Sequence, residues 1–421
     1  METLIIQSAN VLFPNSAFHE AKIDVLIENG KITEISNAGS ITKDNAKVIS
    51  AENMILAPAF FDLNVNFGEP GLETKEDMIS GCAAAIAGGF SGVALHPNTL
   101  PPLQSRSEIA YIKSLEKDVM VDIHPVGTVS KDRKGENLAE LYDMKLSGAI
   151  AFSDGNHTIQ QSSLMSRALL YSKGFDGLIF SFAEDSSISG NTKMNEGVVS
   201  TMLGMKGNPN LAEEIMVARD LFLAEYNEAK IHFSTVSTAG AVRLIREAKS
   251  KGIAVTCDVA AHHLVLTDES VESFDSNFKV RPPLRTEIDR VALIDGLKDG
   301  TIDAIVSQHT PHEIEFKNVE FEKAEFGITG LQTALPLALK AGLSLELIIE
   351  KMSINPRKIL NIPQSELAIG ANANFILFNP DEIWIFDKET NRSKANNSPY
   401  FNSELKGKVH LLTNKNQYYI S

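Results

Sequence analysis

Hydrophobic and polar positions divide the chain into three stretches. Short apolar or alternating segments, separated by turn residues, fill residues 1 to about 55 and return over residues 365–421. Such segments are typical of the strands of a small β-sandwich. Between them, continuous apolar runs alternate with amphipathic helical stretches. This alternation indicates a parallel sheet that is covered by helices on both faces.

Eight apolar runs of the middle stretch are candidate parallel strands. They are residues 55–63, 92–95, 119–123, 149–152, 178–180, 230–233, 254–257 and 302–306. Helical stretches between and after them include residues 75–88, 106–117, 160–173, 211–228, 239–251, 329–341 and 344–351. Eight strand–helix units predict an α/β protein with a (β/α)8 barrel of the TIM type, and an open, doubly wound sheet is the alternative. The predicted domains are a barrel over residues 56–364 and a composite β-sandwich from residues 1–55 and 365–421.

Candidate chemistry first appears where the first of these strands ends. The apolar run Ile55–Phe61 leads into Asp62, and Asn64 and Asn66 follow two residues apart. Side chains at i and i+2 of a strand share a face, so the two amides should point the same way. They lie at the carboxyl end of the strand, where α/β barrels carry their functional residues.

Composition and charge narrow the class of protein. The chain has 421 residues, 43% of them hydrophobic, and a net charge of −15. The acidic balance argues against nucleic acid or an anionic membrane as a partner. Cys82 and Cys257 lie in apolar segments, which predicts buried thiols rather than a disulfide. Residues Met1–Ile6 lack the features of a secretion signal, and no apolar run is long enough to span a bilayer, so a cytoplasmic protein is expected.

Short motifs follow one another along the chain in a fixed order. They are Phe61–Asn66, Ala87–Phe90, His96–Thr99, Ala151–Gly155, Met194–Gly197, Val236–Thr238, His262–Leu264, Pro282–Arg285, His309–His312, Phe326–Leu331 and Asn397–Pro399. Their order and spacing closely resemble those of the type I dihydroorotases of the amidohydrolase superfamily. The resemblance implies the interconversion of N-carbamoyl-aspartate and dihydroorotate. In that reaction a zinc-bound hydroxide attacks a ring amide, and an acidic side chain carries the proton.

The positions that this family uses for metal binding and catalysis carry other residues here. The paired histidines are Asn64 and Asn66, the shortened Asp-Asp-Gly string leaves Asp154 alone, the histidines of the fifth and sixth strands are Phe182 and Thr235, the general base is Gln308, and the arginine that grips the substrate carboxylate is Gly68. Amides and a phenyl ring are poor zinc ligands, and an amide has no useful basicity near neutral pH. The sequence therefore predicts no zinc, no other cofactor and no assigned catalytic residue.

Part of the substrate pocket is retained. Asn98, His312 and the pair Phe326-Gly327 match family positions that contact substrate, whereas Arg281 replaces an asparagine. Arg281 would bring a cation near the vacated site and could partly replace the missing arginine.

Three functions remain open. The first is an inactive dihydroorotase-like protein of pyrimidine biosynthesis, acting as a structural or regulatory partner of aspartate transcarbamoylase, as the resemblance implies; a homo-oligomer is also expected. The second is an active dihydroorotase or related cyclic amidohydrolase with a remodelled site, using Asp154, His232, His309 and His312. For His232 and His309, packing in the core is the alternative. The third is a small-molecule sensor of a carbamoyl-aspartate-like ligand.

Overall fold

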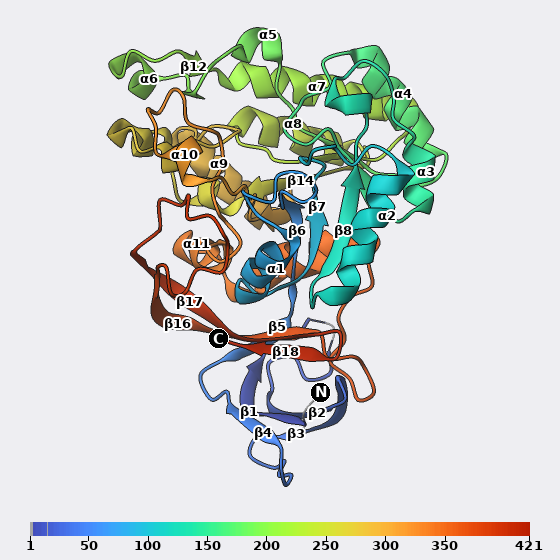
Figure 1. Cartoon of the computed structure of the whole chain (residues 1–421), viewed down its shortest axis with the longest axis vertical. Helices are drawn as coiled ribbons and strands as arrows, with labels where there is room; N and C mark the ends of the chain where they lie inside the picture. The colour runs from blue at the N-terminus through green and yellow to red at the C-terminus, as the bar shows by residue number, and fades with distance from the viewer. Residues whose placement is uncertain (1–2, 15) are drawn as a thin grey trace.

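The computed structural model of the chain describes residues 3–14 and 16–421. Met1 and Glu2, on which part of the prediction about a secretion signal falls, lie outside the described residues. Figure 1 shows two parts, a barrel of strands surrounded by helices and a sheet at its lower end. Blue and red strands lie together in this sheet, so it joins segments from both ends of the chain.

Eight parallel strands form the barrel in chain order. They are β6 (Phe60–Val65), β7 (Phe90–Leu95), β8 (Asp122–Gly127), β9 (Ala151–Phe152), β10 (Ile179–Ser181), β13 (Ile231–Phe233), β14 (Val255–Ala260) and β15 (Ala304–Val306). Each pairs with the next along this order. The predicted (β/α)8 barrel is confirmed, and each predicted strand has a counterpart.

The first barrel strand differs from the prediction. The sequence predicts one strand over residues 55–63, whereas the structure divides this run into β5 (Ile55–Pro58) and β6. β5 pairs with strands of the outer sheet, with Pro58 opposite Phe375. The prediction of one strand is wrong because a continuous apolar run is compatible with either sheet, and periodicity cannot choose between them.

Helices cover the outside of the barrel (Figure 1). They are α1 (Met78–Ala87), α2 (Arg106–Leu115), α3 (Leu141–Leu146), α4 (Ser162–Lys173), α5 (Ser186–Ser189), α6 (Val198–Met202), α7 (Asn210–Asn227), α8 (Ala239–Ser250), α9 (Glu287–Lys298), α10 (Ile314–Lys317), α11 (Ala334–Lys340), α12 (Leu345–Ile349) and α13 (Asn355–Ile359). The predicted helices are confirmed with their ends shifted by a few residues. The one expected over residues 329–341 begins only at Ala334.

The outer sheet is built from both ends of the chain. Its strands are β1 (Leu4–Val11), β2 (Lys22–Glu28), β3 (Lys31–Asn37), β4 (Lys47–Ser50), β5, β16 (Phe375–Phe386), β17 (Ser403–Asn414) and β18 (Gln417–Ile420), in the order β18-β17-β16-β5-β1-β2-β3, with β4 on β1. The predicted fold class, a barrel with a small β-sandwich from both chain ends, is confirmed. The domain boundaries at residues 55 and 365 stay a prediction.

The barrel closes between β6 and β15 mainly through polar groups. Val65 and His309 form one parallel bridge, and the Asn66 backbone N–H donates to the His309 carbonyl oxygen at 2.9 Å. Deeper in the barrel, the Ser307 backbone N–H donates to Asp62 Oδ2 at 3.0 Å, so a buried carboxyl group takes the place of a strand carbonyl. Burial raises the pKa of Asp62 to about 7, against the lowering effect of its hydrogen bonds.

Asn414 fastens the outer sheet to the floor of the barrel. Its Nδ2 donates to the carbonyl oxygens of Ser91 at 3.2 Å and Met120 at 2.9 Å, and to Asp122 Oδ2 at 3.0 Å. These acceptors lie in or beside β7 and β8. Because Asn414 is buried, no water can easily replace its amide as their donor.

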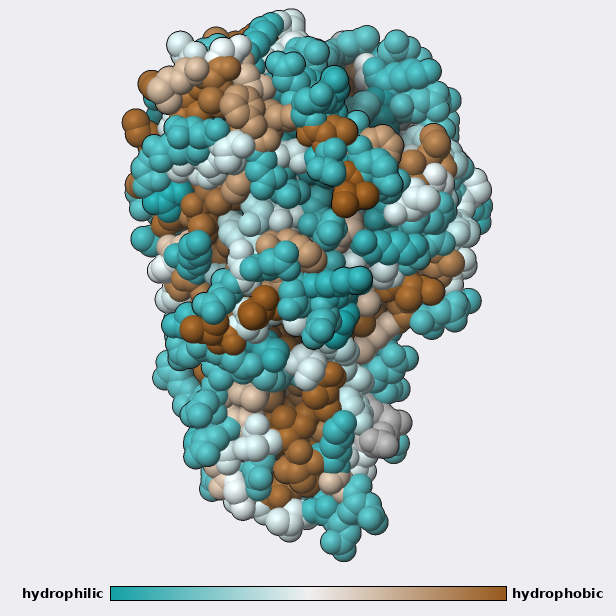
Figure 2. Space-filling model, turned by 60° about the vertical axis from the view of Figure 1, so that its left-hand side comes forward, coloured by the Kyte–Doolittle hydropathy of each residue, from teal (hydrophilic) through white to brown (hydrophobic). Residues whose placement is uncertain are grey.

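The surface and the cysteines agree with the composition. On the face shown in Figure 2, hydrophilic side chains predominate and hydrophobic ones gather in separate patches. Within the described residues, no helix is long and apolar enough to cross a membrane. Cys82 and Cys257 are buried free thiols, as predicted.

Replacing Asn414 with leucine should loosen the attachment between sheet and barrel. The variant keeps the side-chain volume but leaves buried acceptors without a donor, which should lower the free energy of unfolding by about 2–4 kcal/mol. Urea unfolding followed by circular dichroism measures the change. Gln417→Leu, an exposed substitution in neighbouring β18, is the matched control, and equal losses in the two variants would contradict the assignment.

Candidate functional site

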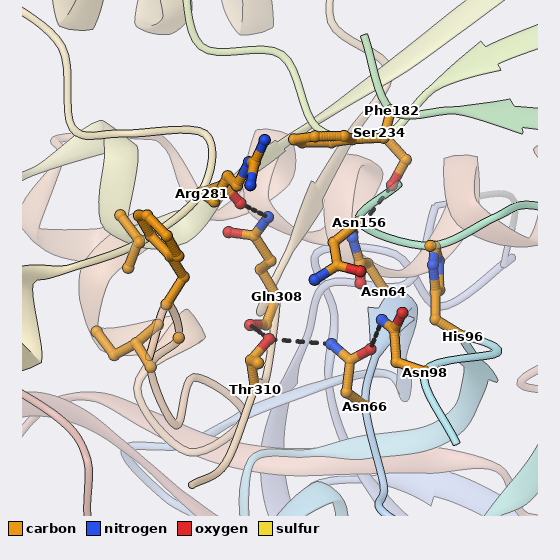
Figure 3. Close-up of a pocket in the computed structure, with 15 residues that line it drawn as sticks. Asn64, Asn66, His96, Asn98, Asn156, Phe182, Ser234, Arg281, Gln308 and Thr310 are labelled. Atoms are coloured by element: carbon orange, nitrogen blue, oxygen red, sulfur yellow. Dashed lines mark hydrogen bonds between the residues drawn. The ribbon is translucent and has the colours of Figure 1, made fainter. Parts of the chain in front are cut away.

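A small polar cavity, called the inner pocket below, lies at the barrel mouth over the β6–β15 seam (Figure 3). The cavity has a volume of about 50 Å³. Its walls are Asn64, Asn66, His96, Asn98, Gly155, Asn156, Phe182, Ser234, Val280, Arg281, Gln308, Thr310, Phe326, Gly327 and Ile328. Most predicted site positions therefore meet here, whereas Asp154, Thr235 and His312 do not line this cavity.

Asn66 is the centre of a directional chain of hydrogen bonds (Figure 3). Its Nδ2 donates to Thr310 Oγ1 at 2.9 Å, as Figure 3 shows. The same nitrogen donates to the His309 carbonyl oxygen at 3.1 Å. Because a carbonyl oxygen only accepts, the amide nitrogen must face it, and Asn66 Oδ1 is left to accept from Asn98 Nδ2. Asn98 Oδ1 then remains buried without a donor among the described residues. The network fixes this oxygen as a free acceptor.

Asn64 and Gln308 are also anchored to the barrel wall. Asn64 Nδ2 donates to Ser234 Oγ at 3.2 Å, and Gln308 Nε2 donates to the Arg281 carbonyl oxygen at 3.0 Å (Figure 3). Gln308 also has a φ of 50°, which a glutamine rarely adopts. Backbone strain of this kind clusters at functional sites, so the position is held by its surroundings.

Arg281 lies between two aromatic rings at the pocket. Its guanidinium carbon is 5.9 Å from the ring centroid of Phe182 and 5.8 Å from that of Phe326, which is within the cation–π range. Its Nε donates to Glu184 Oε2 at 3.3 Å, and its Nη2 donates to Glu184 Oε1. The expected cation is present, but it is paired with a carboxylate of the chain itself. Whether Arg281 replaces the family arginine stays a prediction.

Asp154 and Thr235 point away from the inner pocket. Asp154 Oδ1 accepts from the backbone N–H groups of Val129 and Ser130, each at 2.9 Å, and Oδ2 accepts from the Ser130 hydroxyl. Burial raises the pKa of Asp154, although these hydrogen bonds oppose the shift. Thr235 Oγ1 donates to Asp258 at 2.7 Å. Both side chains bind groups of the loops at the mouth, and neither lines the inner pocket.

Two histidines are engaged inside the barrel. His232 Nε2 donates to Asp258 Oδ2 at 3.0 Å, and its Nδ1 lies 2.8 Å from Thr256 Oγ1. His309 Nδ1 accepts from a backbone N–H at 3.2 Å, and its Nε2 donates to Glu76 at 3.3 Å. Because all four ring nitrogens have partners, the packing interpretation fits these residues better than metal binding.

His96 and His312 border the mouth as neutral imidazoles. His96 Nε2 donates to the Leu63 carbonyl oxygen at 3.1 Å, and His312 Nε2 donates to that of Phe326 at 3.0 Å. Burial lowers the pKa of both to about 4, so both are uncharged at neutral pH. His312 Nδ1 has no partner among the described residues, but His312 lines an adjoining, larger chamber rather than the inner pocket.

Position 68 has no room for a side chain in this backbone. A Cβ added to Gly68 would lie 2.0 Å from the Leu72 carbonyl oxygen, far inside van der Waals contact. The Gly68 N–H donates to Glu76 O at 2.9 Å, and the Leu72 N–H donates to Gly68 O at 2.7 Å. The loop has closed around the glycine, so a single substitution could not restore the arginine of the family.

The residues of the inner pocket do not fit a zinc ion. Zinc is held by imidazole, thiolate or carboxylate groups, whereas Asn64, Asn66, Phe182 and Gln308 present amides and a phenyl ring. Among the residues that the structure describes, no group of three or more His, Cys, Asp or Glu side chains could hold a metal ion. The pocket can hydrogen-bond a polar ligand, but its walls contain no carboxylate to take a proton from water.

Sequence reasoning does not find Ser234, Asn156 or Glu184. Each lies one or two residues from a matched position, since Ser234 precedes Thr235, Asn156 follows Gly155, and Glu184 lies two residues after Phe182. Their position next to a motif was the one feature of the sequence that could have identified these three residues. Arg133, which donates to Asn156 Oδ1 at 2.6 Å, carries no such signal.

The fold defines the class of protein. A (β/α)8 barrel with a flanking sheet from both chain ends is shared with hydantoinases. L-Hydantoinase (dihydropyrimidinase) from Arthrobacter aurescens superposes with a TM-score of 0.85 over 100% of this chain and 96% of its own, at 22% identity. Dihydropyrimidinase from Brevibacillus agri NCHU1002 gives a TM-score of 0.80 over 99% and 95%, at 22% identity. At these identities the likeness shows the amidohydrolase fold alone.

Sequence comparison gives the family within that class. A family model described as Dihydro-orotase-like matches residues 53–241. A dihydroorotase from Syntrophus aciditrophicus (strain SB) is 44% identical over 411 residues, which cover 96% of each chain. One from Geobacter metallireducens is 42% identical over 409 residues, again 96% of each chain. The chain belongs to the dihydroorotase family, as its motifs predict.

Acid should destabilise the fold through His96. Its pKa is about 4 in the folded chain against an ordinary value of 6.5, so between these values the unfolded chain binds a proton that the folded chain does not. The titration of His96 leaves the free energy of unfolding unchanged above pH 6.5. Between pH 6.5 and pH 4 it lowers this free energy by up to about 1.4 kcal/mol per pH unit. His96→Gln, which can still donate to Leu63, should lessen this slope in urea unfolding. A slope equal to that of the unmodified protein would rule out His96 as its source.

Proposed function

We propose that this chain is a catalytically inactive member of the dihydroorotase family that serves pyrimidine biosynthesis as a structural or regulatory partner of aspartate transcarbamoylase. The observation that carries the proposal is the set of side chains in the inner pocket. Amides of Asn64, Asn66 and Gln308 stand where a metal site and a base would be needed. Hydrolysis then lacks both the group that ionises water and the group that takes its proton.

The number of catalytic positions that differ from the family supports this proposal. Removing one member of a catalytic unit commonly lowers the rate by several orders of magnitude, and here the ligand positions, the base and the arginine all differ together. The barrel can fold without these catalytic residues, because its core packing and the chemistry of its mouth loops depend on different side chains. Asn66 illustrates this, since its amide satisfies the His309 carbonyl and Asn98 without a metal.

An active dihydroorotase, or a related cyclic amidohydrolase with a remodelled site, is the competing proposal. The relatives favour it, since proteins that are 40–44% identical to this chain carry the name dihydroorotase. Its candidate groups Asp154, His232 and His309 have their polar atoms engaged elsewhere, and His312 lies outside the inner pocket. This alternative requires loop movements that bring a new ligand set together.

A sensor of a carbamoyl-aspartate-like ligand is supported by one further feature. Asn98 Oδ1 is a buried acceptor that no donor of the described residues reaches, and Arg281 lines the same pocket. A ureide N–H and a carboxylate would complement these two groups. The cytoplasmic location, the expected homo-oligomer and the absence of nucleic-acid and membrane partners stay predictions from the sequence.

Protein purified without chelator should contain far less than one zinc per chain and should convert neither dihydroorotate nor N-carbamoyl-aspartate. The physical reason is that no suitable ligands or base converge in the pocket. Metal analysis by mass spectrometry and assays in both directions measure this. A dihydroorotase relative prepared in parallel controls for metal lost during purification. Stoichiometric zinc, with turnover that a chelator abolishes, would establish the active alternative.

Coexpression with the aspartate transcarbamoylase of the same organism should give one co-eluting complex. Size-exclusion chromatography with light scattering measures its mass and also gives the oligomeric state of the chain alone. Two separate species at concentrations well above micromolar would reject the partnership and leave the claim of inactivity untouched.

A further inference from the structure

A polar cavity, called the side cavity below, is lined by α10 and by the segment of residues 396–402 that leads into β17. It has a volume of about 450 Å³. No described residue lines both this cavity and the inner pocket, so the side cavity is a separate site. Amide and hydroxyl side chains make up much of its wall, among them Ser276, Asn277, Asn396, Asn397 and Ser398.

Two buried lysines bind one loop beside the side cavity, and they differ in their number of hydrogen bonds. Lys279 Nζ donates to three backbone carbonyl oxygens, whereas Lys317 Nζ, on the wall of the cavity, donates to two. An ammonium group has three donors and a neutral amine has two, so the bonds suit a charged Lys279 and a neutral Lys317. The acceptors are Phe321 at 2.7 Å, Glu322 at 3.0 Å and Ala324 at 2.5 Å for Lys279, and Glu325 at 2.9 Å and Gly327 at 3.0 Å for Lys317.

The electrostatic surroundings also favour a neutral Lys317. Burial lowers the pKa of its amine to about 7, and the nearby charge of Lys279 acts in the same direction, whereas Asp275 and Glu325 oppose the shift. An exposed lysine with an ordinary pKa is neutral at pH 7 in fewer than about one molecule in two thousand. A desolvated amine beside a second cation is an arrangement that activates lysine as a nucleophile.

An unpartnered acceptor lies on the same cavity as the Lys317 amine. The Gly327 carbonyl accepts from Lys317 Nζ and, at 3.1 Å, from Asn397 Nδ2, and Asn397 Oδ1 accepts from the His312 backbone N–H at 3.0 Å. These bonds connect three walls of the side cavity. His312 is only 6% exposed, and its Nδ1 has no partner among the described residues. Because Nε2 donates to the Phe326 carbonyl, Nδ1 carries a free lone pair.

We propose that Lys317 is a covalent binding site that forms an imine with a small hydroxylated aldehyde in the side cavity. The amine nitrogen attacks the aldehyde carbon and gives a carbinolamine. The former carbonyl oxygen then leaves as water with the two amine protons, and the C=N bond forms without an oxidant or reductant. His312 Nδ1 can accept a hydrogen bond from the carbinolamine hydroxyl, and the amide and hydroxyl walls suit further hydroxyl groups of the ligand.

The hydrogen bonds of Lys317 can be given up in this reaction. A neutral imine nitrogen carries no proton, so both bonds from Nζ are lost. The Gly327 carbonyl keeps Asn397 as its donor, and Glu325 is exposed, so water can replace the lost donor there. Lys279 differs, because two of its acceptors belong to the buried residues Phe321 and Ala324 and would be left unpaired. The reaction should therefore select Lys317, whether or not the inner pocket is catalytic.

Reductive trapping tests this proposal, with glycolaldehyde as the probe. The full chain is incubated at pH 7 with glycolaldehyde and sodium cyanoborohydride, and the modified lysines are identified by peptide mass spectrometry. Lys317 should be labelled at least about tenfold faster than the exposed Lys251, because far more of its amine is neutral at this pH. The buried Lys279 is the matched control and should stay unlabelled. At pH 9.5 the preference for Lys317 should narrow, because exposed lysines then begin to lose their protons.

The comparison among lysines is made within the unmodified protein, so it does not depend on the folding of a variant. Labelling of Lys317 no faster than that of Lys251, or equal labelling of Lys317 and Lys279, would overturn the proposal. Propionaldehyde, which has no hydroxyl group, should give a smaller ratio of Lys317 to Lys251 labelling than glycolaldehyde. An equal ratio would overturn the assignment of a hydroxylated ligand. None of these outcomes depends on whether dihydroorotate is hydrolysed.

Discussion

A barrel of parallel strands is complete only when its first and last strands meet, and in this chain that seam depends on side chains. Among the residues that the structure describes, backbone contacts across the β6–β15 seam involve Val65, Asn66 and His309. The Asp62 carboxyl group accepts the Ser307 N–H deeper in the barrel, and the Asn66 amide binds the His309 carbonyl at the mouth. The inner pocket lies directly over this seam, so the same strand that closes the barrel also forms the site.

This double role gives the amide substitutions a physical meaning. Asparagine donates and accepts at once, so Asn66 can bridge the His309 carbonyl and Asn98. A histidine in a metal site would direct a lone pair into the cavity instead. The amides at these positions take part in closing the barrel, so the proposed loss of the metal site is compatible with a stable fold.

The fold could be predicted from the sequence because the strand pattern, the helix pattern and the order of the motifs all indicate the same barrel. Apolar runs and helical periodicity repeat eight times, and the motifs keep their order, so the positions of the missing ligands can be recognised. The directions of side chains could not be predicted in the same way. Asp154 turns to Ser130, and Arg281 pairs with Glu184, nearly a hundred residues away. These contacts depend on which loops meet at the mouth. β5 joins the outer sheet for a similar reason, since strand pairing is decided by long-range partners.

The central claim is that the barrel mouth carries a closed amide network in place of a metal site. Crystals grown with zinc and measured on both sides of the zinc absorption edge test it most directly. The account predicts no anomalous peak in the inner pocket and an Asn66 amide that faces the His309 carbonyl. A peak there, bound by three or more side chains, would contradict it.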